Sequence, residues 1–174
     1  MQDFVHLHVH TQYSLLDGQA SVSRLVDKAM KDGMKGIAVT DHGNMFGIKE
    51  FTNYVNKKNS GPKGEIKDLK KRIAGIESGE IECEDKEAEI ADCRAKMAEA
   101  ESKLFKPIVG CEMYVARRTM DKKEGKPDQS GYHLIVLAKN EKGYHNLIKL
   151  VSHAWTRGYY MRPRTDRSEL EKDH

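Results

Sequence analysis

The strongest constraint on the fold is an alternation between two hydrophobic periods along the chain. Strand-like apolar patterns, either alternating or continuous, are found at residues 4–10, 36–40, 107–115 and 132–138. Apolar residues spaced three and four apart, which form one face of a helix, are found at residues 22–30, 48–55 and 144–151. Because strands alternate with helices over short connections, we expect an α/β fold with a mostly parallel sheet or a barrel.

Residues 63–106 interrupt this alternation. They are dominated by charged side chains of both signs and contain neither Trp nor Tyr. Two narrow apolar stripes, from Ile66 to Ile76 and from Ile90 to Leu104, flank the sequence "ESGEIECED". They predict a charged antiparallel helical hairpin, which we interpret as an insertion over residues 60–105. We expect a solvated arm without chemistry of its own, and the alternative is docking of a partner or of nucleic acid.

Three histidines occupy every second position of the first predicted strand: His6, His8 and His10. Alternate side chains on a strand share a face, so His8 and His10 could bind one metal ion. Three ligands on one straight strand would spread over about 13 Å, which is too far for one ion. We therefore expect His6 to contact a metal-binding side chain or to face the substrate, and not to bind the metal itself. The H-x-H pattern alone is equally compatible with an ordinary strand that exposes its imidazoles to solvent.

Further metal-competent side chains lie in or just after the predicted strands: Asp17, His42, Glu112 and His133. Asp17 could simply form a turn, and His133 could be a core histidine. A carboxylate at position 112 needs a partner if it is buried, and bridging two cations would provide one. Asp41 could accept a hydrogen bond from a metal-binding imidazole. Because strand ends gather in α/β folds, these residues predict a multinuclear hydrolytic site for divalent ions such as Zn, Mn or Fe.

The overall charge and the cysteines limit the remaining possibilities. A net charge of +3 is too small to indicate nucleic-acid binding by itself. No apolar run reaches membrane-spanning length, and the N-terminus lacks the layout of a signal peptide. Three cysteines without a C-x-x-C pair favour a reducing compartment, so we expect a cytoplasmic protein. The segment "RGYYMRPRTDR" (157–167) would suit a phosphate or a single nucleic-acid strand, or is simply a basic loop.

Five sequence blocks together resemble a known family. They are "HLHVHTQYSLLDG", "GIAVTDHGNMFG", "KPIVGCEMYVA", "HLIVLAKNEKGYHNLIKLVS" and "RPRTD". They resemble the PHP (polymerase and histidinol phosphatase) family, in the form that begins bacterial replicative DNA polymerase III alpha subunits. The resemblance covers nearly the whole chain apart from residues 60–105. H-x-H and T-D-H alone would indicate only the superfamily, whereas "YSLLDG" and "DHGNMFG" point to the polymerase branch.

The resemblance implies a distorted (β/α)7 barrel with up to three divalent metal ions at the strand ends. It implies three ligand sets: His8 with His10, Glu112 with His133, and Asp17 with His42. Glu112 would bridge the first two ions. The family pattern continues beyond residue 174 with a further Cys or His ligand and an Asp-x-His pair. We therefore expect residues 1–174 to be the N-terminal portion of a PHP domain, forming a partial barrel.

The resemblance also implies a function. We expect a metal-dependent phosphoesterase within a DNA-directed DNA polymerase, a nucleotidyltransferase, where it would act as a 3′→5′ proofreading exonuclease during DNA replication. Its partners would be the primer 3′ end, the remaining polymerase domains and other replisome subunits. Two alternatives stay open. The domain could be a non-catalytic scaffold that docks partners, or the chain could belong to a free-standing phosphatase of the same superfamily.

Overall fold

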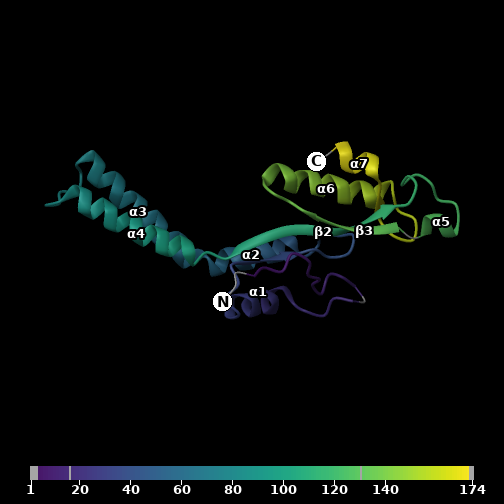
Figure 1. The fold of residues 1–174 in the computed structure, drawn as a ribbon, viewed down its shortest axis with the longest axis horizontal. Helices are drawn as coiled ribbons and strands as arrows, with labels where there is room; N and C mark the ends of the chain where they lie inside the picture. Colours follow the sequence, from purple (N-terminus) through teal and green to yellow (C-terminus); the bar gives the residue numbers. More distant parts are fainter. Residues whose placement is uncertain (1–3, 16, 130, 173–174) are drawn as a thin grey trace. The chain divides into compact units, whose positions relative to one another are not determined.

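The computed structural model describes residues 4–15, 17–129 and 131–172. The chain divides into two compact units, one formed by residues 1–53 and 107–174 and the other by residues 54–106. The first unit contains a sheet with helices beside it, and the second is helical (Figure 1). The α/β class predicted from the alternating periods is therefore confirmed. The seven-stranded barrel stays a prediction.

The sheet of the first unit is built around one long strand, β2 (Lys106–Ala116). Its neighbours are β1 (Gly36–Val39) and β3 (Gly131–Leu137), and β4 (Arg164–Thr165) also pairs with it. The β2–β4 pair is parallel, as expected, and an isolated parallel bridge joins His42 to Glu112.

The pairing of β2 with β3 is antiparallel and differs from the expected parallel arrangement. Ala116, the last residue of β2, pairs with Gly131, the first residue of β3. The connection holds only the four-residue helix α5 (Lys126–Gln129), so the chain turns back at the same end of the sheet. A parallel neighbour would need a crossover that returns to the opposite end of β2.

Residues 4–10 do not form the regular strand that their alternation predicts. The segment runs beside β1, where the carbonyl of His6 accepts from the amide of Ala38 and that of Val9 accepts from Thr40. The two hydrogen bonds are three residues apart in the first segment, at His6 and Val9, but only two residues apart in the second, at Ala38 and Thr40. The first segment therefore contains one extra residue at this point of the pairing. Such a bulge interrupts the regular ladder and bends the chain.

Four further helices belong wholly or partly to the first unit. They are α1 (Val22–Lys31), α2 (Ile48–Lys58), α6 (Glu141–Thr156) and α7 (Arg167–Lys172). Asn140 caps α6, because its side chain accepts from the amide of Gly143. Ser21 is the N-cap residue of α1 but makes no capping hydrogen bond through its side chain.

One hydrophobic cluster in the core of the first unit lies between β2 and α6. It contains Cys111 and Met113 from β2 together with residues of α6, namely Leu147, Leu150, Val151 and Ala154. In Figure 1, α6 lies on one side of β2 and β3, and α1 lies on the other. This packing fixes β2 from both directions, so side chains in its middle are held on a rigid element.

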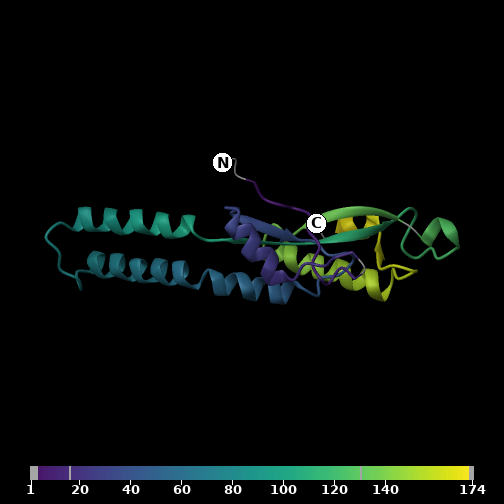
Figure 2. The ribbon, with the colours of Figure 1, turned by 90° about the horizontal axis from the view of Figure 1, so that it is seen from below.

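The second unit contains α3 (Ser60–Ser78) and α4 (Lys86–Ser102), which pack along each other (Figure 2). Arg72 on α3 pairs with Glu89 on α4, and Asp85 caps α4 through the amide of Ala88. Asn59 joins the two ends of the unit, since its side chain donates to the carbonyl of Phe105 and accepts from the amide of the same residue. The interpretation of residues 60–105 as an insertion stays a prediction.

Among the described residues, no helix combines the length and the apolar character needed to cross a membrane.

Candidate metal centre

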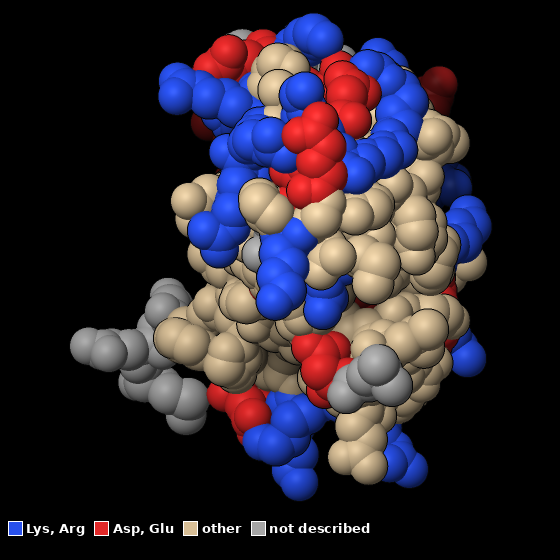
Figure 3. Space-filling view, turned by 90° about the vertical axis from the view of Figure 1, so that its right-hand side faces the viewer, with Lys and Arg blue, Asp and Glu red and all other residues tan. Residues whose placement is uncertain are grey.

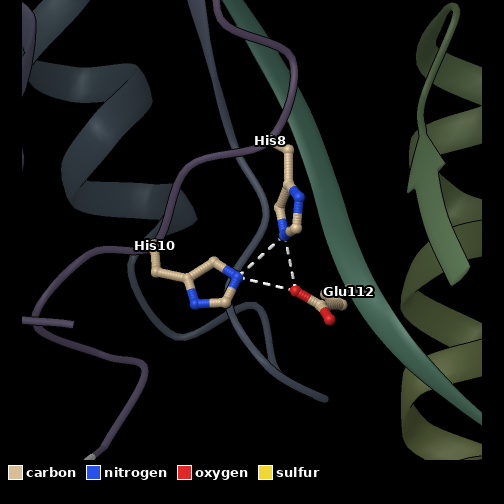
Figure 4. Close-up of side chains that lie close together, drawn as sticks. All are labelled: His8, His10 and Glu112. Carbon is tan, nitrogen blue, oxygen red and sulfur yellow. Dashed lines mark hydrogen bonds and ion pairs between the residues drawn. The ribbon is translucent and has the colours of Figure 1, made fainter. Parts of the chain in front are cut away.

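Two histidines and a glutamate from distant parts of the sequence converge at the middle of β2. His8 Nε2 lies 2.6 Å from Glu112 Oε2, and His10 Nε2 lies 2.7 Å from the same oxygen. The two Nε2 atoms are 3.0 Å apart (Figure 4). The structure therefore brings together His8 and His10, as their shared face predicts, and adds Glu112 to them.

Asp17 and His42 form a second group together with His10. Asp17 Oδ2 lies 3.0 Å from His10 Nδ1 and 2.8 Å from His42 Nε2. His10 thus faces Glu112 with one ring nitrogen and Asp17 with the other. This places two candidate metal positions side by side.

His133 completes a third group with His42 and Glu112. Its Nδ1 contacts Glu112 Oε1, the carboxylate oxygen that His8 and His10 do not use. The strand register explains the meeting, because Tyr114 pairs with His133 and Tyr114 shares a face with Glu112. In each of the three groups, the possible ligand atoms lie within 4.8 Å of one another.

The surroundings of Glu112 keep its carboxylate ionised. Burial by itself raises the pKa of Glu112, but hydrogen bonds from His133, His8 and His10 and the nearby charge of His42 outweigh it and bring the pKa to about 2. The side chain is only 5% exposed. An anionic carboxylate that presents both oxygens to imidazoles is the form that a bridging metal ligand requires.

One atom in this cluster lacks a hydrogen-bond partner among the described residues. His42 Nδ1 is buried, and it lies 3.7 Å from Glu112 Oε1. Buried polar atoms are rarely left without a partner, so this unpaired imidazole nitrogen is a candidate ligand for a metal ion. The whole donor set is imidazole nitrogen and carboxylate oxygen, which fits Zn, Mn or Fe.

Asp41 does not contact an imidazole, contrary to the role expected for it. Its buried carboxylate accepts from the amide of Thr11 at 2.6 Å, from the Thr11 hydroxyl at 2.8 Å and from the Ser14 hydroxyl at 3.1 Å. Ser14 Oγ in turn accepts from the amide of His42. Asp41 therefore fixes the turn that follows His10 and acts on the cluster through the backbone.

The turn that presents Asp17 depends on Gly18. A Cβ atom at position 18 would lie 1.8 Å from the carbonyl oxygen of Thr11, so no larger residue fits there without a shift of the backbone. The Asp-Gly pair is consequently a tight turn, as its sequence suggests. The same turn also delivers the Asp17 carboxylate to His10 and His42.

His6 lies outside all three groups. It is exposed, and its ring packs edge-on against Phe4 with centroids 4.7 Å apart. The bulge beside β1 separates it from the face that His8 and His10 share. His6 also lines a cavity of about 410 Å³ together with His8 and His10, so it faces open space beside the cluster.

Tyr114 is a site residue that the sequence reasoning did not select. Its ring stacks on His42 at 5.6 Å between centroids and packs edge-on against His133 at 4.9 Å. Its hydroxyl accepts from Arg162 Nη1 at 2.7 Å. The sequence did contain a signal for Tyr114. It lies two residues after Glu112 on the same strand, so its side chain points to the same face.

Comparison with known proteins gives a consistent result. Residues 6–174 match the family model described as "PHP domain". DNA polymerase III subunit alpha from Borreliella burgdorferi is 40% identical over 170 residues, which cover 97% of this chain and 11% of that protein. The proteins of the same name from Treponema pallidum and Aquifex aeolicus are 39% and 33% identical over 98% of this chain and 11% of their own length. The chain thus spans about a tenth of the length of these relatives.

Proposed function

Because the chain belongs to the PHP domain family, we propose that it is the N-terminal PHP module of a DNA polymerase III alpha subunit. We further propose that its histidine–carboxylate cluster holds divalent cations and hydrolyses phosphodiesters as a 3′→5′ proofreading exonuclease. The partners would then be the primer 3′ end, the rest of the polymerase and other replisome subunits, in the bacterial cytoplasm.

One observation carries this proposal: the two oxygens of Glu112 serve different imidazoles. Oε2 faces His8 and His10, whereas Oε1 faces His133. A carboxylate divided in this way is suited to bridging two cations. Asp17 and His42 would hold a third cation through the oxygen and nitrogen that already lie 2.8 Å apart.

Cations bound at this cluster would supply Lewis acidity toward a phosphodiester and activation of water at neutral pH. The residues of the chain supply position and charge. Asp41 and Ser14 lock the turn between His10 and Asp17, and Tyr114 holds the planes of His42 and His133. Before any cation binds, hydrogen bonds from three imidazoles hold the pKa of Glu112 well below its ordinary value, so its carboxylate is anionic.

The cluster is accessible to a substrate from one side. The side chains of His8 and His133 are 52% and 49% exposed, whereas Glu112 beneath them is 5% exposed. A phosphate group can therefore approach the imidazoles without a rearrangement of β2. This combination of a buried bridging carboxylate and exposed imidazoles favours a catalytic site over a metal that only stabilises the fold.

The experiment is an exonuclease assay on the protein expressed from its complete reading frame. A labelled primer with a mismatched 3′ end is digested in the presence of Mn²⁺, without nucleotides, by the wild type and by His8→Ala combined with His10→Ala. We expect the double variant to lose the digestion, and His145→Ala, an exposed histidine outside the cluster, to keep it. Primer extension by each variant is the control for an intact protein.

Unchanged digestion by the double variant would contradict the proposal. Absence of digestion in the wild type, with metal bound and with normal primer extension, would instead favour a scaffold role for the domain.

A further inference from the structure

A second feature beside the metal centre is a groove of about 210 Å³ whose lining includes His42 and Tyr114. Its other walls include Phe46 from the loop between β1 and α2, Trp155 from the last turn of α6 and Tyr159 from the segment after α6. The groove therefore shares a wall with the candidate metal centre.

The groove is lined by aromatic rings that are open to solvent. Phe46, Trp155 and Tyr159 are 64%, 43% and 48% exposed. Trp155 and Tyr159 stack on each other with centroids 5.6 Å apart and an interplanar angle of 20°, and Phe46 lies 6.4 Å from Trp155. Stacked, exposed aromatic rings of this kind are the surface on which nucleobases of single strands pack.

The indole of Trp155 is fixed in place and is not a loosely exposed side chain. Its Nε1 donates to the carbonyl of Gly43 at 2.8 Å, and Gly43 directly follows His42. The same hydrogen bond therefore ties the aromatic surface to the backbone of the metal centre. A base stacked on this surface would carry its phosphate close to the cluster.

A positive charge lies at the wall that the groove shares with the cluster. The Arg162 guanidinium sits 4.9 Å from the centre of the Tyr114 ring and donates to its hydroxyl, and Tyr114 stacks on His42. Arg162 is exposed, so the other N–H groups of its guanidinium can bind an anion. Met161 beside it has a positive φ of 62°, an unusual backbone state for a methionine that is found preferentially at functional turns.

The segment that carries Tyr159 and Arg162 is held rigid from beneath by Arg164. This buried side chain donates to four backbone carbonyls, those of Gly158, Asp128, Met120 and Lys122. Between residues 117 and 126, which this network anchors, exposed basic side chains outnumber acidic ones. Figure 3, which looks onto the side that carries α5, shows Lys and Arg side chains gathered with some acidic ones over the upper part of this face.

We propose that this groove binds the 3′-terminal nucleotides of single-stranded DNA, with a base stacked on Trp155 and Tyr159 and the adjoining phosphate paired with Arg162. The inference rests on the proposed function and deepens it, because it assigns the surface that seats the strand whose terminal phosphodiester reaches the cluster. All parts of this surface lie within the first unit: the aromatic rings, the Arg162 guanidinium and the wall shared at His42. Together they match the alternation of base and phosphate along a strand.

The test is photocrosslinking on the protein from its complete reading frame. A single-stranded oligodeoxynucleotide with iodouracil as its 3′-terminal base is irradiated with the protein in excess EDTA, so that no cleavage occurs, and the crosslinked peptide is identified by mass spectrometry. We expect the crosslink within residues 155–162 of the wild type, and a large loss of it in Tyr159→Leu. Tyr132→Leu is the matched control, because Tyr132 is likewise an exposed tyrosine but lies outside the groove.

A second readout uses digestion with Mn²⁺. Tyr159→Leu should lower kcat/KM for a single strand roughly tenfold, as the loss of one stacked base predicts, and Tyr159→Trp should restore it. A wild-type crosslink that maps only elsewhere, or equal crosslinking and digestion by Tyr159→Leu, would overturn the inference. Crosslinking at the groove without any digestion would contradict the proposed activity alone, whereas digestion without the crosslink would contradict this inference alone.

Discussion

His42 Nε2 lies 2.8 Å from Asp17 Oδ2, although 24 residues lie between them in the sequence. The other nitrogen of the same ring, Nδ1, has no hydrogen-bond partner in the part of the chain that the structure describes. His42 therefore stands between Asp17 and Glu112 and belongs to two of the three ligand groups.

Asp17→Asn should lower the metal affinity at one of the three candidate positions and leave the affinity at the other two unchanged. The amide keeps the size of the carboxylate but loses the charge that faces His10 and His42. We expect the metal-to-protein ratio, measured by elemental analysis after dialysis against Mn²⁺, to fall without reaching zero. Asp92→Asn, which removes an exposed carboxylate paired with Lys96 on α4, should leave the ratio unchanged. Equal ratios for Asp17→Asn and the wild type would contradict a metal position there.

Asp41→Asn should destabilise the first unit although Asp41 contacts no imidazole. The amide nitrogen would place a donor where the Thr11 amide and two hydroxyls now donate to a buried carboxylate. We expect the free energy of unfolding to fall by about 1–3 kcal/mol, measured by urea denaturation. Metal affinity should fall with it, because the turn between His10 and Asp17 loses its anchor. A stable variant with unchanged metal affinity would refute this positioning role.

Because of Asp166, the free energy of unfolding should decrease as the pH falls into the acid range. Burial raises its pKa, but the amide of Met120, the Ser168 hydroxyl and the amide of Glu169 outweigh this and hold the pKa below the ordinary value for aspartate. A lowered pKa in the folded state means that its contribution is complete above the ordinary pKa and is lost as the pH falls through the lowered one. Asp166→Asn should therefore lower the urea midpoint at neutral pH and flatten its decline in acid. A parallel decline for both proteins would count against this.

Asn59→Ala should loosen the helical unit without affecting the metal centre. The substitution removes both hydrogen bonds to Phe105, at 2.8 and 2.9 Å, and leaves buried backbone groups unpaired. We expect faster hydrogen exchange in α3 and α4, corresponding to about 1–3 kcal/mol, with unchanged metal content. Asn56→Ala, which removes one exposed hydrogen bond to Lys63, should leave the exchange as in the wild type. Altered metal content in Asn59→Ala would show that the two units are coupled.

Much of the fold could be predicted because hydrophobic period and capping are local properties. The apolar runs around Ile37 and Cys111 predicted two strands, and the apolar spacing over residues 144–151 predicted the helix α6. The antiparallel return of β3 could not be predicted, since it depends on where the chain turns after Ala116. The bulge beside β1 was also hidden, because it arises from pairing with Ala38 and Thr40 and leaves no mark in the alternation of residues 4–10.

The candidate site was predictable where chemistry and spacing agree. His8 and His10 were selected by their shared face, and Glu112 by a carboxylate in an apolar strand. Arg162 was not assigned to the site, because its contact with Tyr114 joins positions 48 residues apart. The role of Asp41 was misjudged for a similar reason, since its partners lie in the turn at Thr11 and Ser14. That the assembled residues hold metal stays a prediction.

The most direct test of the central claim is the metal content of Glu112→Gln in the protein from its complete reading frame. Glu112 presents separate oxygens to His8 and His133, so one substitution should disturb two metal positions together. After dialysis against Mn²⁺, we predict more than one ion per wild-type protein and a larger loss in Glu112→Gln than in Asp17→Asn. A wild type that retains no metal, or a Glu112→Gln variant that retains all of it, would contradict the account.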